Sequence, residues 1–294
     1  GVLGAGNYAQ AVFLPVIRKT GGAELAGIAT ASGMSAQQAA RKFGFRFAAT
    51  SEEEVLTNPE INTVVILTRH QHHTRQVLKA LRNKKAVYCE KPLALNQAEL
   101  DEIEAELSSA DTPLLTVGYN RRFAPMAQQL AEFLKARSEP LFIQYRVNAG
   151  ALPMTHWLHD PLQGGGRIIG EGCHFIDFLT FLVGDMPMSV SAAALPDNEK
   201  YRQDNVQLTF RYPDGSIGTV IYLASGNRNF GKERIEAFTS SRIAVLEDFR
   251  SLELVTETSR KTTRSRLRQD KGHANAWKAF LQAVEKGGPA PIPY

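Results

Sequence analysis

The sequence of 294 residues has little cysteine, little net charge and no long apolar run, and each shortage narrows the class of protein. No apolar stretch approaches the about 20 residues that a membrane-spanning helix needs. Cys89 and Cys173 lack metal-ligand spacing and lie in apolar stretches, so we expect reduced core thiols in a cytoplasmic protein. Hydrophobic residues make up 43 % and charged residues 22 %, which is typical of a soluble globular fold.

The net charge of +4 is too small to indicate a nucleic-acid partner, and nothing indicates a membrane partner. The positive excess is concentrated in one segment of six basic residues: Arg260, Lys261, Arg264, Arg266, Arg268 and Lys271. One interpretation is an edge strand or loop that charge keeps solvated. The other is a site for an anionic partner, such as a phosphorylated substrate.

The order of predicted elements divides the chain near residue 118. Residues 1–118 alternate short apolar strands with amphipathic helices, which predicts an α/β Rossmann domain with a parallel sheet. One of these helices is expected over 35–43, with Ser35 as its cap. Residues 119–294 are rich in strands and end in a helix over 273–286, which predicts an α+β domain with a large open, mainly antiparallel sheet. Asp214-Gly215 and Ser240-Ser241 are typical of hairpin turns.

The chain opens with Gly4-x-Gly6-x-x-Ala9 between a strand and a helix, which is a dinucleotide-binding pattern. Gly4 permits the tight turn, Gly6 lets the backbone approach a pyrophosphate, and Ala9 allows close packing of helix on sheet. A similar glycine turn occurs in methyltransferases, which leaves adenosylmethionine binding as a rival hypothesis.

The end of the second strand commonly selects between NAD and NADP. An acidic residue there would hold the ribose hydroxyls and repel a 2′-phosphate. This chain has Thr30-Ala31-Ser32 instead, and Arg41 follows one helix later. We therefore expect NAD(P) as the cofactor, with a weak preference for NADP.

About eighty residues after the glycine motif, an apolar strand ends in Glu90-Lys91-Pro92. Together the two motifs resemble the signatures of the Gfo/Idh/MocA family of nicotinamide-dependent oxidoreductases. In that family a further loop, which lies along the cofactor, reads Thr-Pro-Asn-x-x-His. The corresponding loop here follows the strand expected over 63–67: Thr68 and His73 match the pattern, whereas Arg69 and His70 replace Pro-Asn. The strand-to-helix turn would splay the histidines of this loop, so we predict no metal site. The motifs and their resemblance implicate these cofactor-binding residues: Gly4, Gly6, Asn7, Tyr8, Ala9, Thr30, Ser32, Thr68, His70, His73, Glu90 and Lys91.

The second half contains three glycines at 164–166 and then a segment that resembles the family's Asp-x-Gly-x-His helix. Gly172, His174 and Asp177 match the pattern, which makes His174 the expected general acid/base. Gly170 stands where the family has its acid, and Glu171 is its neighbour. Because positions i and i+3 share a helical face, Glu171 could take over that function; it could equally point elsewhere, with Asp177 as the other candidate to orient His174.

Hydride transfer to or from an alcohol carbon needs a positive group at the reacting oxygen, and Lys91 suits that function. The resemblance implies a sugar- or cyclitol-like substrate in contact with Lys91, Arg122, Trp157 and His174, and pairing of subunits through the flat sheet of the second domain. The closest likeness within the family is the C-terminal half of two-part bacterial proteins with an alcohol-dehydrogenase-like module ahead of it. The alternative hypothesis, of a different functional class, is a non-catalytic nucleotide-dependent sensor or scaffold. It stays open because Gly170 stands where the family has its acid.

Overall fold

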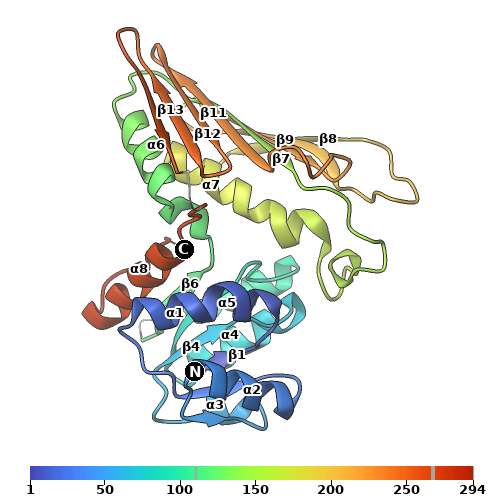
Figure 1. The fold of residues 1–294 in the computed structure, drawn as a ribbon, viewed down its shortest axis with the longest axis vertical. Coiled ribbons are helices and arrows are strands. Elements are labelled where there is room, and N and C mark those ends of the chain that lie inside the picture. The colour runs from blue at the N-terminus through green and yellow to red at the C-terminus, as the bar shows by residue number, and fades with distance from the viewer. Residues whose placement is uncertain (110, 266–268, 294) are drawn as a thin grey trace. The chain divides into compact units, whose positions relative to one another are not determined.

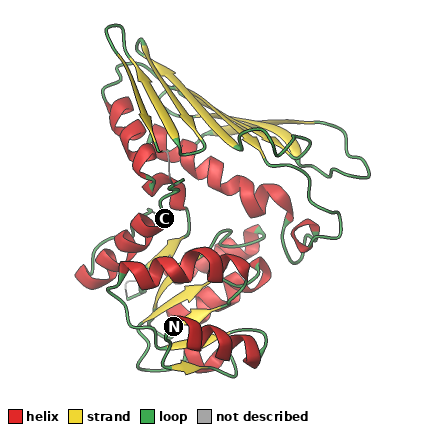
Figure 2. Ribbon diagram, viewed as in Figure 1, coloured by secondary structure: helices red, strands yellow, loops and turns green. Residues whose placement is uncertain are grey.

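A computed structural model describes residues 1–109, 111–265 and 269–293. The chain forms two compact units, each described here by itself. Unit 1 comprises residues 1–119, 160–165 and 273–294, and unit 2 comprises residues 120–159 and 166–272. Figure 1 shows the elements of each unit, and Figure 2 separates helices from strands.

Unit 1 is built on a parallel six-stranded sheet of order β3-β2-β1-β4-β5-β6. The strands are β1 (Val2–Leu3), β2 (Gly27–Ala29), β3 (Phe47–Ala48), β4 (Thr63–Ile66), β5 (Ala86–Cys89) and β6 (Leu115–Val117). The helices are η1 (Ala9–Phe13), α1 (Leu14–Thr20), α2 (Gly33–Phe43), α3 (Glu53–Leu56), η2 (His70–His72), α4 (His73–Arg82), α5 (Gln97–Leu107) and α8 (His273–Lys286). β1, β4 and β5 are adjacent, so the loops that follow them share one edge of the sheet.

Two apolar clusters form the core of unit 1. One contains Val64, Ile66 and Val87 of the strands with residues of α4 and Ile103 of α5. The other joins Phe13 and Tyr88 to Trp277 and Phe280 of α8, and these rings pack in edge-to-face and tilted pairs at centroid distances of 4.8–5.9 Å. The C-terminal helix therefore belongs to the core of the nucleotide-binding fold.

Unit 2 contains an eight-stranded sheet of order β14-β13-β12-β11-β7-β10-β9-β8, in which only the pair β7 and β10 is parallel. The strands are β7 (Phe142–Asn148), β8 (Ser189–Ala194), β9 (Asn205–Arg211), β10 (Ile217–Leu223), β11 (Glu233–Thr239), β12 (Arg242–Glu247), β13 (Ser251–Val255) and β14 (Arg260–Arg264). The helices are η3 (Asn120–Phe123), α6 (Pro125–Lys135), η4 (Trp157–His159), η5 (Ile168–Gly172) and α7 (Cys173–Val183). Helices α6 and α7 cover one face of the sheet, where Phe175, Phe178 and Leu179 are fully buried (Figure 2).

The predicted fold class is confirmed: a parallel Rossmann-type sheet is followed by a large, mostly antiparallel one. The division at residue 118 differs from the compact units in two segments. Residues 160–165 and α8 were placed with the second half but pack with the first, because their contacts are with the loop after β4 and with α1. Sequence order alone does not reveal such a return of the chain.

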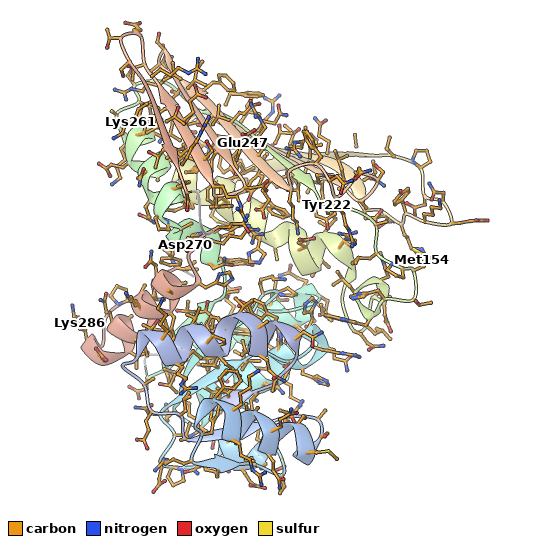
Figure 3. All side chains as sticks on the ribbon, viewed as in Figure 1. Met154, Tyr222, Glu247, Lys261, Asp270 and Lys286 are labelled. Carbon is orange, nitrogen blue, oxygen red and sulfur yellow. The ribbon has the colours of Figure 1, made fainter. Side chains whose placement is uncertain are left out.

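Three further details correct or refine the sequence analysis. Helix α2 begins at Gly33, and its cap is Ser32, whose hydroxyl accepts a hydrogen bond from the amide of Ser35; the prediction of Ser35 as cap was wrong. The basic segment forms the edge strand β14, where Lys261 is exposed (Figure 3) and Arg260 pairs with Glu253, whereas Arg266 and Arg268 lie outside the described residues. Within the described ranges, no helix is long and apolar enough to cross a membrane, and neither cysteine forms a disulfide.

Candidate active site

The glycine motif of unit 1 forms the turn between β1 and η1. Gly4 has a φ of +96°, and a Cβ there would lie 2.7 Å from the carbonyl oxygen of Leu67, so no other residue fits without strain. Gly6 is different, because a Cβ at that position would meet nothing within 4 Å. The space beside Gly6, at the start of a helix, is the place where a dinucleotide pyrophosphate approaches the backbone. The residues present therefore fit an NAD(P) molecule.

A hydrogen bond joins the glycine motif to the Glu90-Lys91-Pro92 segment. The hydroxyl of Tyr8 donates to Oε1 of Glu90 over 2.8 Å, although the two residues are 82 positions apart. Glu90 is 8 % exposed and also accepts a hydrogen bond from the Lys91 amide at 3.3 Å. Lys91 lies two residues after the end of β5, is half-buried, and thus lies at the same sheet edge as the glycine motif. The structure brings Gly6, Tyr8, Glu90 and Lys91 into one neighbourhood.

The loop after β4 holds the three histidines in different environments. The Nδ1 atom of His70 donates to the carbonyl oxygen of Gly164 at 2.9 Å, and burial lowers the pKa of His70 to about 4. His72 lies near the surface. His73 is fully buried at the start of α4, and its ring nitrogens face the carbonyl oxygens of Pro92 and Thr68. Among the described residues, no group of three or more His, Cys, Asp or Glu side chains could hold a metal ion.

The end of β2 carries hydroxyl groups and no carboxylate. The hydroxyl of Thr30 donates to the carbonyl oxygen of Ser32 at 2.6 Å, which engages it locally. The Ser32 hydroxyl accepts from Ser35 and keeps its own proton to donate. Arg41 is nine residues farther along the helix, about 13 Å at 1.5 Å per residue. Ser32 therefore keeps a donor proton, whereas Thr30 uses its own within the loop.

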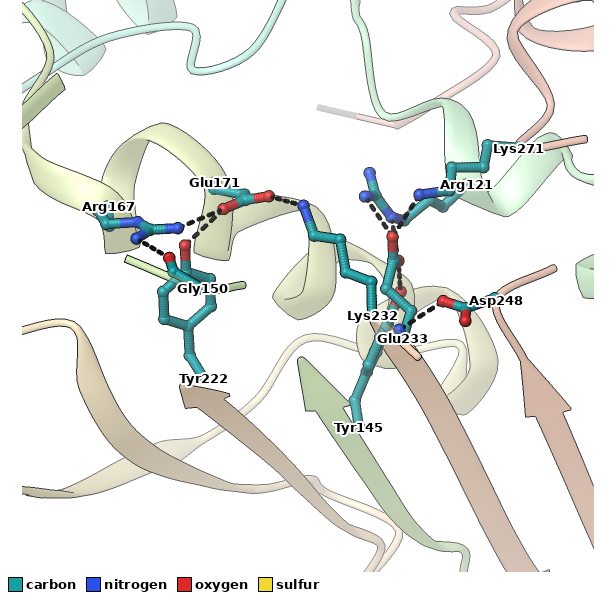
Figure 4. Close-up of polar contacts among 10 residues, drawn as sticks. All are labelled: Arg121, Tyr145, Gly150, Arg167, Glu171, Tyr222, Lys232, Glu233, Asp248 and Lys271. Atoms are coloured by element: carbon teal, nitrogen blue, oxygen red, sulfur yellow. Dashed lines mark hydrogen bonds and ion pairs between the residues drawn. The ribbon is translucent and has the colours of Figure 1, made fainter. Parts of the chain in front are cut away.

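The segment of three glycines leads into η5 of unit 2, a π-helical turn that precedes α7 and carries Glu171. Figure 4 shows Glu171 with Arg167, Tyr222 and Lys232. The amide of Cys173 donates to the carbonyl oxygen of Ile168, five residues earlier. Such a turn inserts a residue into the helix and changes which side chains share a face. The carboxylate of Glu171 receives Lys232 at 2.6 Å and the Tyr222 hydroxyl at 2.5 Å, and Arg167 lies 3.6 Å away. Although burial alone would raise the pKa of Glu171, the Lys232 ammonium and the other donors lower it to about 2.

His174 and Asp177 lie on the first turns of α7. His174 is 7 % exposed. Asp177 forms a bidentate ion pair with Arg122, with Nε of the guanidinium at 3.1 Å, and Arg122 also lies 5.4 Å from the centroid of the Phe181 ring. Burial raises the pKa of Asp177 despite this partner. The structure thus joins the predicted residues Asp177 and Arg122 in one ion pair. The predicted residue Trp157 lies on η4, and its ring centroid is 5.7 Å from that of His156.

A second charged cluster is buried deeper in unit 2. Glu233, which is 1 % exposed, accepts from Arg121 at 2.8 and 3.1 Å, from Lys271 at 2.5 Å and from the Tyr145 hydroxyl at 2.6 Å (Figure 4). These donors hold the pKa of Glu233 well below its usual range, although burial alone would raise it. Lys271 belonged to the predicted basic segment, and its partner is this internal carboxylate. The cluster fixes η3 to β7 and β11.

Sequence reasoning missed the partners of Glu171. Tyr222 and Lys232 are 51 and 61 residues away and carry no motif, so no local signal marks them. Arg167 could have been noticed, because it lies four residues before Glu171 and directly after the three glycines.

The comparisons with known proteins agree with this geometry. Residues 1–119 match the Gfo/Idh/MocA model described as an oxidoreductase family with an NAD-binding Rossmann fold, and residues 137–241 match the C-terminal domain model of the same family. The chain therefore belongs to the Gfo/Idh/MocA oxidoreductase family.

Individual relatives act on ring compounds according to their names. The chain is 29 % identical over 202 residues to trans-1,2-dihydrobenzene-1,2-diol dehydrogenase of Mus musculus, covering 65 % of this chain and 58 % of that protein. It is 24 % identical over 264 residues to myo-inositol 2-dehydrogenase of Thermotoga maritima, covering 85 % of this chain and 78 % of that protein. The chain thus spans little more than half the length of the mouse relative. A structure of levoglucosan dehydrogenase in complex with NADH and levoglucosan shares the fold at a TM-score of 0.87 and 20 % identity, covering 100 % of this chain and 91 % of that one.

Proposed function

We propose that the protein is an NAD(P)-dependent oxidoreductase that interconverts a secondary alcohol and a ketone on a sugar- or cyclitol-like ring. The observation that carries the proposal is the hydrogen bond between Tyr8 and Glu90, which couples the nucleotide-binding turn to the segment that presents Lys91. The names of the mouse and Thermotoga relatives, which denote a cyclic diol and a cyclitol, support this substrate class.

Each proposed residue has a definite chemical function. Gly4, Gly6 and Ala9 would admit the dinucleotide, which when bound supplies the hydride donor or acceptor. The Lys91 ammonium stabilises negative charge on the reacting oxygen. His174 takes or returns the proton of that oxygen, with Glu171 or Asp177 as the group that orients it. Arg122 and Trp157 complete the proposed substrate contacts, Arg122 through the ion pair that fixes its guanidinium.

We further propose that NADPH binds at least as tightly as NADH. The absence of an acidic residue between positions 30 and 35 supports this proposal, because nothing there repels a 2′-phosphate. Fluorescence titration with both nucleotides decides it, and a clear preference for NADH would refute it. Ser32→Asp should convert the preference toward NADH, since a carboxylate would repel the phosphate.

The experiment that tests the activity is a turnover screen. Purified protein is mixed with NAD⁺ or NADP⁺ and with myo-inositol, a trans-cyclohexadienediol and simple pyranoses, and absorbance of the reduced nucleotide is followed. Oxidation of any ring alcohol supports the proposal. Tight nucleotide binding with no turnover in either direction would favour the second candidate, a nucleotide-dependent sensor. Gly170 favours that candidate, because it removes the family's acid, and so does the engagement of Glu171 by Lys232 and Tyr222.

We also propose that two copies pair through the open face of the unit 2 sheet. Phe142, Phe238 and Ile243 are 47, 40 and 36 % exposed and stand opposite one another on β7, β11 and β12, where they line a shallow hollow. An apolar row across three strands on the uncovered face is typical of a surface that a second copy buries. Light scattering should show a dimer or higher oligomer that Phe238→Lys dissociates; a monomeric wild type would refute the proposal.

A further inference from the structure

His73 has an arrangement that neutral histidine cannot satisfy. Its side chain is 0 % exposed, with Nδ1 2.7 Å from the carbonyl oxygen of Pro92 and Nε2 3.1 Å from that of Thr68. Carbonyl oxygens only accept hydrogen bonds, so each contact needs a proton on the ring nitrogen. A neutral imidazole carries one such proton and an imidazolium carries two. Both bonds exist together only when the ring is doubly protonated.

The two carbonyl groups belong to the two loops of unit 1 that carry the proposed contacts with cofactor and substrate. Thr68 follows β4 in the loop that the family places along the cofactor, and Pro92 follows Lys91 directly. The same segment is held a few residues farther along as well, because the amide of Leu95 donates to Oε2 of Glu99 at 2.8 Å. The hydrogen bond between His73 and the carbonyl oxygen of Pro92 is thus the one nearest to Lys91 among these contacts on its C-terminal side.

We propose that His73 is a positioning residue whose ring nitrogens separately hold these loops, Nδ1 the Lys91 segment and Nε2 the loop after β4. The bridge is complete in the imidazolium form and loses one bond in the neutral form. Its link to hydride transfer rests on the proposed function of Lys91, whereas the bridge itself is a property of unit 1 alone.

Several groups face the ring and set its charge. Burial lowers the pKa of His73, the carbonyl oxygens of Pro92 and Thr68 raise it, and Lys91 and His72 lower it, with a net direction downward. The His70 ring lies 5.7 Å away between centroids and is neutral above pH 4. Glu99 on α5 is engaged by Leu95 and Thr74. Rising pH therefore removes one bond of the bridge, which loosens one of the two loops.

Two amide variants separate the two bonds. In His73→Asn the side-chain amide nitrogen takes the place of Nδ1 and can still reach Pro92; in His73→Gln it takes the place of Nε2 and can still reach Thr68. His72→Asn is the matched control, since the neighbouring ring is only partly buried and hydrogen-bonds to Gln71. Circular dichroism and thermal melting establish that each variant is folded.

Hydrogen–deuterium exchange of the backbone measures the loops without reference to catalysis. At acidic pH, where the wild-type ring carries both protons, we expect exchange of the 90–95 segment to rise about tenfold in His73→Gln and to stay near wild type in His73→Asn, because one buried hydrogen bond is worth about a factor of ten. Exchange of the 67–72 segment should show the reverse pattern. Equal exchange in both variants, or no change in either, would show that His73 only fills space and would overturn the proposal.

Two functional readouts complete the test. Weaker NADH binding by fluorescence is expected for His73→Asn, and a lower kcat at unchanged KM for His73→Gln. If the exchange pattern holds while no nucleotide binds wild-type protein, the proposed function fails and the bridge stands. If nucleotide binds and turns over but the exchange pattern is absent, the bridge fails and the function stands.

Discussion

Glu171→Gln gives the sharpest physical prediction, because it removes one charge and keeps the shape of the side chain. The Glu171 carboxylate is 20 % exposed and lies 2.6 Å from Lys232 and 2.5 Å from the Tyr222 hydroxyl. A pKa lowered from 4.5 to about 2 corresponds to about 3 kcal/mol of stabilisation of the ionised form. This is an upper value, because Lys232 is 41 % exposed and solvent screens the pair.

The sign follows from proton linkage. The unfolded chain binds a proton at Glu171 near pH 4.5 while the folded protein resists it until about pH 2, so acid favours unfolding within that window. Above about pH 5 the full contribution is present, and it is lost as the pH falls toward 2. Denaturant unfolding of wild type and Glu171→Gln at pH 7, 5, 4 and 3 should show a difference in unfolding free energy that shrinks by at most about 2 kcal/mol between pH 7 and pH 3.

The control is Glu132→Gln, which removes a carboxylate from an exposed pair with Lys135 and should give a small difference. A wild-type advantage over Glu171→Gln that stays constant from pH 7 to pH 3 would refute the electrostatic reasoning.

The remaining predictions concern catalysis, the buried cluster and the glycine turn. Glu171→Gln should lower turnover and move the acidic limb of the pH profile downward, because a carboxylate beside an imidazolium raises its pKa, and Gly170→Asp should restore part of the rate; an unchanged profile would assign the orienting function to Asp177. Glu233→Gln should cost about 3–5 kcal/mol in denaturant unfolding, since it leaves the buried Arg121 without its carboxylate; a cost below about 1 kcal/mol would contradict a strong pair. Gly6→Val should abolish NADH binding at an unchanged melting temperature, whereas Gly4→Ala should lower that temperature because its Cβ meets Leu67; equal melting behaviour would contradict the geometry.

Local patterns predicted the elements well wherever neighbouring residues decide the structure. The expected helix over 273–286 is α8, and the Ser240-Ser241 hairpin turn joins β11 to β12 with both serines at positive φ. The glycine motif follows β1 and the Lys91 segment follows β5, and both lie at the same edge of the parallel sheet with β4 between the two strands.

Long-range contacts could not be predicted in this way. The i,i+3 argument for Glu171 and His174 assumed a regular α-helix, but a π-helical turn separates the two residues, and Glu171 instead meets side chains of β10 and of the residue before β11. That Glu171 orients His174 stays a prediction. Likewise, α8 has the sequence of an ordinary amphipathic helix, and only the edge-to-face packing of Trp277 and Phe280 on Tyr88 reveals that it completes unit 1.

The most direct test of the proposed chemistry compares Lys91→Met with Lys84→Met, a change of the same kind at an exposed lysine of unit 1. Nucleotide affinity is measured by fluorescence, and turnover is measured with the ring alcohol that the wild type oxidises fastest. Loss of a preorganised positive charge at the reacting oxygen should lower kcat by about 10²–10³ with nucleotide affinity nearly unchanged, while Lys84→Met should behave as wild type. A rate close to wild type in Lys91→Met would contradict the assignment of Lys91 to the reacting oxygen and restrict this lysine to a structural function.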